Sequence, residues 1–125
     1  MSNVVFENDT PFEVFKVLDE MGFQQNLLGY DYLAYAIKHC MDVYPQKPKI
    51  IGDVYPSVAK IFDTTAIRVE RAIRHSIERA FIRGDMDVMH KYFGNSIHPD
   101  DGKVTNAHFM YCVASKLRMK DNMLD

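Results

Sequence analysis

The chain has 125 residues, a formal net charge of −2 and an apolar fraction of 47%, which together indicate one globular domain with a single core. No apolar run approaches the roughly 18 residues of a membrane span, and the acidic N-terminus lacks the basic and then apolar pattern of a signal peptide. We therefore expect a cytoplasmic protein without a membrane partner. Its two cysteines, Cys40 and Cys112, are too few for a disulfide framework and are expected to be buried reduced thiols.

Hydrophobic periodicity predicts an all-α fold. Residues 1–9 show no periodicity and are interpreted as a flexible tail or linker remnant that precedes a helical domain at residues 10–120. No segment alternates with the period of two that a half-buried strand shows. The helical segments lie at about 11–21, 30–44, 55–62, 65–83, 86–93 and from 105 onward. We therefore expect six helices in a bundle-like packing around one core.

Capping residues mark the ends of several of these segments. Thr10, Pro11 and Glu13 form the pattern of a capping box with proline at the first helical position. Gly22 is expected to end this helix, and Asp85 is expected to begin the helix at 86–93. The apolar stripe of the first helix consists of Phe12, Phe15, Leu18 and Met21. The last helix is expected to begin after a threonine cap at position 105.

The segment at residues 63–84 is the most informative part of the sequence. At about 100° per residue it forms one amphipathic helix that a pair of threonines opens. Val69, Ala72, Ile73, Ser76, Ile77 and Ala80 lie on one side, and Arg68, Arg71, Arg74, His75 and Glu78 lie on the other. An arginine face after a short helix and a tight turn is typical of a DNA-reading helix-turn-helix. A solvent face with Glu70–Arg74 and Arg74–Glu78 ion pairs explains the same charges equally well.

Charge is distributed unevenly along the chain. Residues 64–83 carry five arginines against two glutamates, a net charge of +3, whereas residues 1–31 carry six acidic residues against one lysine, a net charge of −5. A protein polarised in this way can present a basic face to DNA while its acidic end disfavours wrong orientations.

Short motifs within residues 55–94 identify a family. They are Tyr55-Pro56, Ala59-Lys60, Phe62, Thr64-Thr65 and the run RVERAIRH from Arg68 to His75. These motifs resemble the DNA-binding effector domain of the stage-zero sporulation protein A family, the master response regulators of sporulation. The resemblance extends from about Thr10 to Arg118. Matching residues outside the motif are Gly29-Tyr30, Tyr32-Leu33, Ala36-Ile37, Arg83-Gly84, Phe93-Gly94, Thr105-Asn106, Phe109 and Val113-Ala114-Lys116-Leu117-Arg118.

The resemblance implies the six-helix effector domain of a two-component response regulator, with a helix-turn-helix at about residues 56–75. Thr65–Arg83 would be the recognition helix and would enter the major groove of double-stranded DNA at boxes of the TGTCGAA type. Arg68, Glu70 and Arg71 match the base-reading residues of the family. The chemistry agrees, because arginine can fork onto guanine and glutamate can accept from cytosine. The resemblance thus favours DNA readout over a purely solvated face.

Other candidate DNA contacts would position the domain on the duplex without reading its sequence. They are Lys47, Lys49, Lys60, Thr64, Thr65, Arg74 and His75. For His75, a phosphate contact and a surface cap of the helix remain equally open.

The resemblance also implies a contact with the RNA polymerase sigma subunit through the helix that follows the recognition helix. The candidates are Val88, Met89 and Phe93, of which only Phe93 matches the family, and core packing is an equal alternative for Phe93. Tandem boxes would imply a DNA-templated dimer. The alternative function is a protein-interaction module that binds the sigma subunit or the parent regulator and no longer reads DNA. The retained base-reading residues count against this alternative.

A receiver domain is not expected before residue 10, so the sequence is either an excised effector domain or a stand-alone copy, and the first nine residues favour the excised domain. No catalytic constellation or phosphate loop is present, so we expect neither an enzyme nor a cofactor. His108 and Cys112 are four residues apart and could offer two metal ligands, but no second close pair accompanies them. No metal site is therefore expected.

Overall fold

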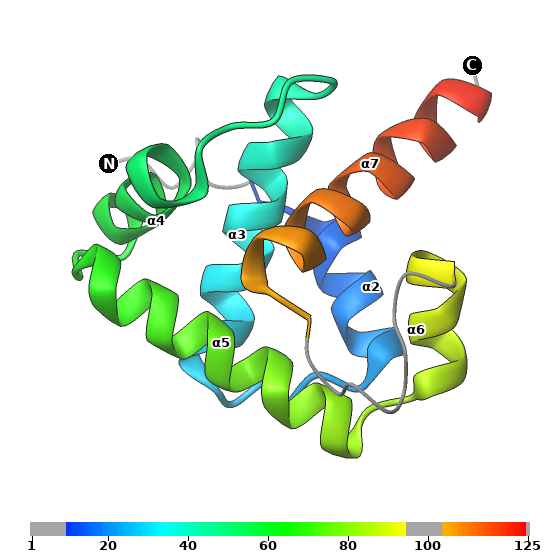
Figure 1. Ribbon diagram of the computed structural model, residues 1–125, viewed down its shortest axis with the longest axis horizontal. Helices are drawn as coiled ribbons and strands as arrows, with labels where there is room; N and C mark the ends of the chain where they lie inside the picture. The colour runs from blue at the N-terminus through cyan, green and yellow to red at the C-terminus, as the bar shows by residue number, and fades with distance from the viewer. Residues whose placement is uncertain (1–9, 95–103, 125) are drawn as a thin grey trace.

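The computed structural model describes residues 10–94 and 104–124, and all regular structure in those residues is helical (Figure 1). The elements are α2 (Phe12–Met21), α3 (Leu28–Val43), the π-helix η1 (Ile50–Val54), α4 (Tyr55–Ile61), α5 (Ala66–Arg83), α6 (Met86–Phe93) and α7 (Asn106–Leu124). These six α-helices confirm the predicted all-α fold. The predicted tail at residues 1–9 lies outside the described residues.

Helix α2 begins one residue later than predicted. Pro11 has φ −83° and ψ 65°, which are not helical, so it occupies the N-cap position instead of the first turn. The predicted apolar stripe is also partly wrong, because Phe12 is 69% exposed. The buried side chains of α2 are Val14, Val17, Leu18 and Met21. Gly22 ends the helix as predicted, at a φ of 91° that favours glycine.

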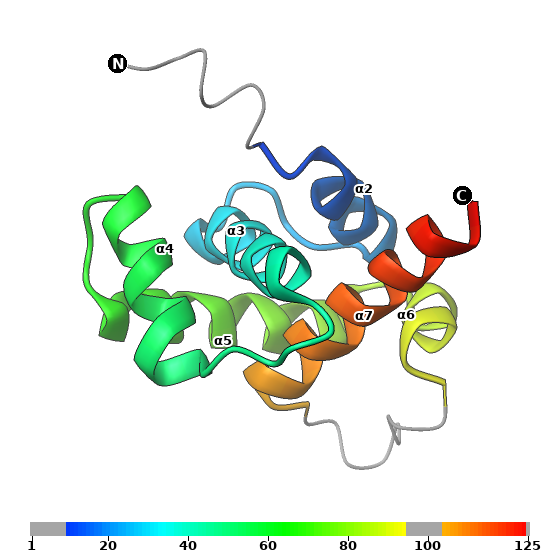
Figure 2. The same cartoon turned by 90° about the horizontal axis from the view of Figure 1, so that it is seen from above.

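Helix α3 lies at the centre of the domain, between α2 and α5 (Figure 2). It begins two residues before the predicted Tyr30, because the amide of Tyr30 already bonds to the carbonyl of Leu27 at 3.0 Å. Gly29 lies where α3 crosses α5. A Cβ at this position would overlap the carbonyl oxygen of Ala72 and the Oγ of Ser76. The absence of a side chain therefore permits the close approach of the two helices.

The π-helix η1 is an element that the periodicity did not predict. The amides of Asp53 and Val54 both bond to the carbonyl of Lys49 at 3.0 Å. The segment contains a glycine and three β-branched residues, which are weak helix formers, and five residues are too few to show a period. Because η1 runs directly into α4, it buries Val54 beside Tyr55 and Val58.

The caps of α6 and α7 are those predicted. Asp85 Oδ1 accepts hydrogen bonds from the amides of Asp87 and Val88 at 3.0 and 3.3 Å. Thr105 Oγ1 accepts from the amide of His108 at 3.1 Å. Each cap satisfies amides that the first turn of a helix leaves without an intrahelical partner.

The junction between α5 and α6 is attached to the end of α2. The amide of Asp85 bonds to the carbonyl of Met21 at 2.8 Å. A Cβ on Gly84 would meet that carbonyl and the Met89 side chain, and a Cβ on Gly22 would lie 3.0 Å from the Cα of Gly84. Two glycines therefore allow the backbones to meet here.

The two sides of the domain differ in charge. Helix α2, with exposed Glu13, Asp19 and Glu20, lies across α3 from most of α5 (Figure 2). The acidic and basic segments of the described chain thus face different directions, as the charge distribution predicted. No helix in the described residues is long and apolar enough to span a membrane.

Candidate nucleic-acid interface

A tight turn between α4 and α5 sets the direction of the arginine-bearing helix. Asp63 adopts a φ of 53°, a left-handed conformation that aspartate tolerates better than most residues. The amide of Thr64 bonds back to the carbonyl of Ala59 at 2.9 Å. Thr65 then caps α5, because its Oγ1 accepts from the amide of Arg68 at 3.2 Å. Helices α4 and α5 therefore form the predicted helix-turn-helix.

The outer face of α5 carries the predicted basic residues. Arg68, Arg71, Arg74 and His75 are exposed, whereas Glu70 is half-buried. The buried residues are Val69, Ile73, Ser76, Ile77 and Ala80. The sequence therefore predicted both faces of α5 correctly, apart from Ala72 at their border, which is only half-buried.

The three candidate base-reading residues point in different directions around α5. Arg68 and Glu70 are two residues apart, which is about 200° around an α-helix, so they project from opposite flanks. Arg71 projects between them, close to the centre of the exposed face. In a groove, the centre of this face would meet the base edges directly, and the longer side chains on its flanks would have to reach inward to read bases. Arg71 therefore has the most direct access to bases.

Glu70 and Arg74 form one of the two ion pairs that the solvated-face interpretation predicted. Arg74 Nη1 lies 3.3 Å from Glu70 Oε2. Within the part of the chain that the structure describes, Arg74 makes no corresponding pair with Glu78. The Arg74 side chain is 54% exposed, and an exposed ion pair contributes little to stability. Arg74 can therefore be drawn to a phosphate or base at small cost.

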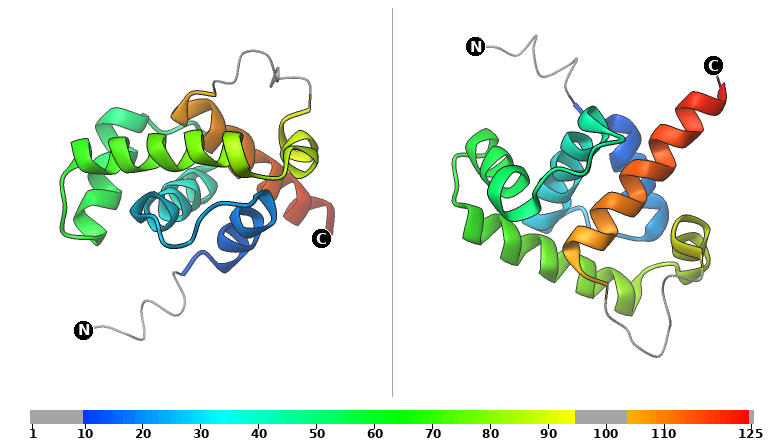
Figure 3. Two further views of the ribbon diagram at one scale, coloured as in Figure 1. Left: turned by 90° about the horizontal axis from the view of Figure 1, so that it is seen from below. Right: turned by 45° about the horizontal axis from the view of Figure 1, so that its top comes forward.

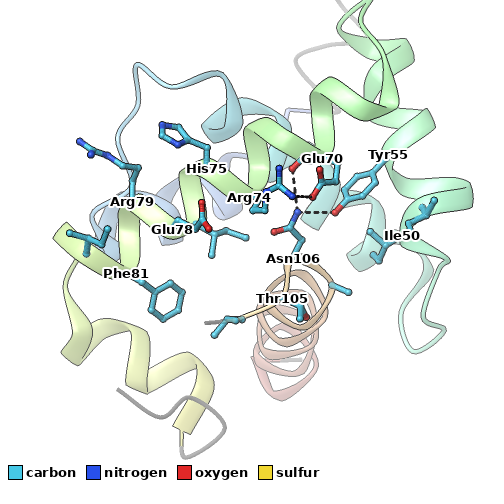
Figure 4. A pocket seen from close by; sticks show the side chains of 15 residues that line it. Ile50, Tyr55, Glu70, Arg74, His75, Glu78, Arg79, Phe81, Thr105 and Asn106 are labelled. Carbon is cyan, nitrogen blue, oxygen red and sulfur yellow. Dashed lines mark hydrogen bonds and ion pairs between the residues drawn. The ribbon is translucent and has the colours of Figure 1, made fainter. Parts of the chain in front are cut away.

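Three helices meet at Asn106, the first residue of α7. Its Nδ2 donates to the hydroxyl of Tyr55 at 2.9 Å and to the carbonyl of Glu70 at 3.4 Å (Figure 4). Burial raises the pKa of Tyr55, so its phenol stays neutral. Tyr55 and Asn106 belong to the family resemblance, but neither had a predicted role. Their contact holds α4, α5 and α7 together on one flank of the candidate interface.

A groove of about 860 Å³ extends along α5 from this junction. Its lining combines apolar side chains such as Ile77 and Phe81 with charged ones such as Glu78. Figure 4 shows Glu70 and Arg74 beside Asn106, while His75 and Arg79 lie farther along α5. One flank of α5 is therefore open over much of its length.

The predicted lysine contacts do not all lie near α5. Lys60 is exposed on α4, just before the turn. Lys47 lies instead against α7, with its Nζ 5.6 Å from the centre of the Tyr111 ring. The loop that carries Lys47 and Lys49 leaves α3 at the end remote from α5 (Figure 1 and Figure 3). Lys60 is therefore exposed next to the turn that precedes α5, whereas Lys47 contacts α7.

The candidate sigma-contact residues on α6 mostly belong to the core. Met89 is fully buried and Phe93 is 5% exposed. The Phe93 ring lies 5.1 Å from the ring of Phe109 on α7. Val88 is half-buried. The burial favours core packing for Phe93, the alternative that the sequence left open.

Cys112 and His108 lie close together on α7. Cys112 Sγ is 3.6 Å from His108 Nε2, and burial raises the pKa of the Cys112 thiol. Among the described residues, no cluster of three or more histidine, cysteine or acidic side chains could hold a metal ion. Cys40 is buried as predicted, whereas Cys112 is only half-buried. This corrects the expectation that both thiols are buried, because Cys112 lies at the edge of the α7 core face.

The described residues form a helical domain of the helix-turn-helix class, in which the second helix of the motif exposes a row of basic side chains. The family model described as "Sporulation initiation factor Spo0A C terminal" matches residues 14–117. The chain therefore belongs to the Spo0A C-terminal family. It is a DNA-binding domain of the sporulation-regulator type, as the resemblance implied.

Proposed function

We propose that residues 10–120 act as a sequence-specific transcription regulator that places α5 in the major groove at boxes of the TGTCGAA type. The observation that carries this proposal is the exposed row of Arg68, Arg71, Arg74 and His75 on a helix whose opposite side is buried. The tight turn and the cap at Thr65 leave the N-terminal end of α5 accessible, and this is the end with which a recognition helix meets bases.

The proposal involves two kinds of DNA contact, base readout and backbone binding. Arg71 and Arg68 fork onto guanine edges and Glu70 accepts from a cytosine amino group, each good pair contributing roughly 1–3 kcal/mol of discrimination. Glu70 can do so only when Arg74 releases it, for example to a phosphate. The remaining contacts bind the backbone and make affinity fall with salt. Lys60, Thr64, Thr65, Arg74 and His75 are the backbone candidates on α4, the turn and α5, and Lys49 directly precedes Ile50, which lines the groove along α5.

Partner contacts form a further part of the proposal. A contact of α6 with the sigma subunit would have to use its exposed residues Asp87, His90 and Lys91, because Met89 and Phe93 are buried. Val88 is half-buried and could contribute the exposed part of its side chain to this contact. On tandem boxes, two copies would form a dimer that the DNA templates.

The test is fluorescence-anisotropy binding to a duplex with one TGTCGAA box and to a scrambled duplex of equal composition, each at low and moderate salt. We expect tighter binding to the box and a preference that persists as salt rises. The variant Arg71→Ala should lose roughly 1–3 kcal/mol and relax the preference at one base position. Equal, salt-sensitive binding to both duplexes would reject sequence reading. Absence of binding would favour the alternative of a protein-interaction module.

A further inference from the structure

Ile67 is a large apolar side chain that the fold leaves in solvent. It is the second residue of α5 and is 65% exposed. Isoleucine is a weaker helix former than alanine or arginine, so at this position it improves neither helix stability nor the core. Single exposed apolar residues are common on proteins, and the position of Ile67 is therefore what gives it meaning.

Ile67 shares the outer face of α5 with the basic row. Arg71 is four residues later and Arg74 is seven residues later, so all three side chains project on the same side of the helix. All three are exposed. Because the side chains around Ile67 are basic, this surface is poorly suited to an apolar protein interface. It suits an anionic partner that carries a local apolar group.

The major groove contains one such group on its base edges, the 5-methyl of thymine. The N-terminal residues of a recognition helix are those that reach base edges. We infer that Ile67 is a specificity-determining residue that packs its side chain against a thymine methyl and so adds an apolar contact to the readout by Arg71. This inference rests on the proposed function, because it requires α5 to lie in the groove.

The experiment is a coupling cycle between the protein and the DNA. Each thymine of the TGTCGAA box, on either strand, is replaced in turn by deoxyuridine, which removes only the methyl group. Affinities of the wild type and of Ile67→Ala are then measured for every duplex. Ile82→Ala is the matched control, because Ile82 is an equally exposed isoleucine, 75% in solvent, at the other end of the same helix.

We expect one thymine position at which deoxyuridine weakens wild-type binding about fourfold, the factor that corresponds to one buried methyl group. Ile67→Ala should bind the thymine and deoxyuridine duplexes equally at that position, and Ile82→Ala should behave as the wild type. Both variants should keep the wild-type melting temperature or exceed it, because alanine favours an exposed helix.

Two results overturn the inference. If the box is preferred but loss of the methyl group has the same effect on the wild type and on Ile67→Ala, Ile67 does not read thymine and the proposed function stands. If the wild type does not prefer the box over the scrambled duplex, the proposed function fails and the inference fails with it.

Discussion

Gly29 of α3 lies directly against Ser76 of α5, with no room for even a methyl group between the two helices. Ser76 is 2% exposed, and its Oγ has no hydrogen-bond partner among the residues that the structure describes. Helix α3 thus packs against the buried side of α5 through backbone atoms and small side chains. This contact keeps α3 and α5 at close approach.

The variant Gly29→Ala should destabilise the domain. Inserting a methyl group into a packed contact costs about 1–3 kcal/mol, and here the obstacle is partly the Ala72 backbone, which cannot rotate away. This loss should exceed the roughly 1 kcal/mol that alanine gains over glycine within a helix. Urea unfolding measures the difference. Gly52→Ala is the control, because a Cβ there meets only the Lys49 side chain at 4.0 Å; equal stabilities of the two variants would contradict the prediction.

The bond between Asn106 and Tyr55 should appear as a coupling energy. Asn106→Ala and Tyr55→Phe each remove one partner of the 2.9 Å hydrogen bond, so their effects on stability should not add. We expect a coupling of about 1 kcal/mol in a double-mutant cycle followed by thermal unfolding. Strictly additive effects would mean that the bond does not hold α7 to α4.

Phe93→Ala should lower the stability of the domain by about 3–5 kcal/mol, because it empties a buried site beside Phe109. The exposed neighbour Lys91 provides the control, and Lys91→Ala should melt as the wild type does. A Phe93→Ala variant with an unchanged melting temperature would show that this side chain is free to serve a partner.

Lys60 and Lys47 should differ in their effect on DNA binding. Lys60→Ala should weaken binding to all sequences alike and reduce the slope of log affinity against log salt by about one. Lys47→Ala should leave the slope unchanged, because Lys47 lies against Tyr111 of α7. A reduced slope for Lys47→Ala would place its loop on the DNA.

Cys40 should resist thiol reagents until the domain unfolds. Burial and, to a smaller degree, the charge of Asp53 raise the pKa of its thiol to about 12. The thiolate is the reactive form, so at pH 8 the folded protein offers almost none. The variant Cys112→Ser leaves Cys40 as the thiol to be measured. In this variant, the fraction of Cys40 that reacts with a disulfide reagent should rise with urea in parallel with the fraction of unfolded protein. Rapid reaction without urea would contradict the burial.

Sequence patterns correctly predicted the features of the fold that depend on residues close together in the sequence. Gly22, Asp85 and Thr105 end or begin helices because their conformation or side chain acts within a few residues. The buried and exposed sides of α5 follow from its period. By contrast, η1 is too short to show a period, and its β-branched residues and glycine resemble a loop.

The parts of the candidate interface that the sequence missed depend on distant residues. Asn106 meets Tyr55 across 51 positions of sequence, and no local pattern indicates such a pair. Whether Lys47 lies near the arginines depends on where the chain runs after α3, which no local pattern indicates. Phe93 fitted a surface contact and a core position equally, and only its packing on Phe109 distinguishes them.

Helix α5 is attached at four places along its length: the turn after α4, the bond from Asn106 to Glu70, the Gly29 crossing and the junction of Gly84 with the end of α2. A helix that is held at both ends and along its middle has little conformational freedom, so it loses little conformational entropy when it binds a ligand. The entropic cost of ordering this element is therefore met during folding, before any encounter. If α5 enters the groove as proposed, adjustments of fit fall to the duplex and not to α5, so boxes that deform easily should be favoured at positions that no side chain touches.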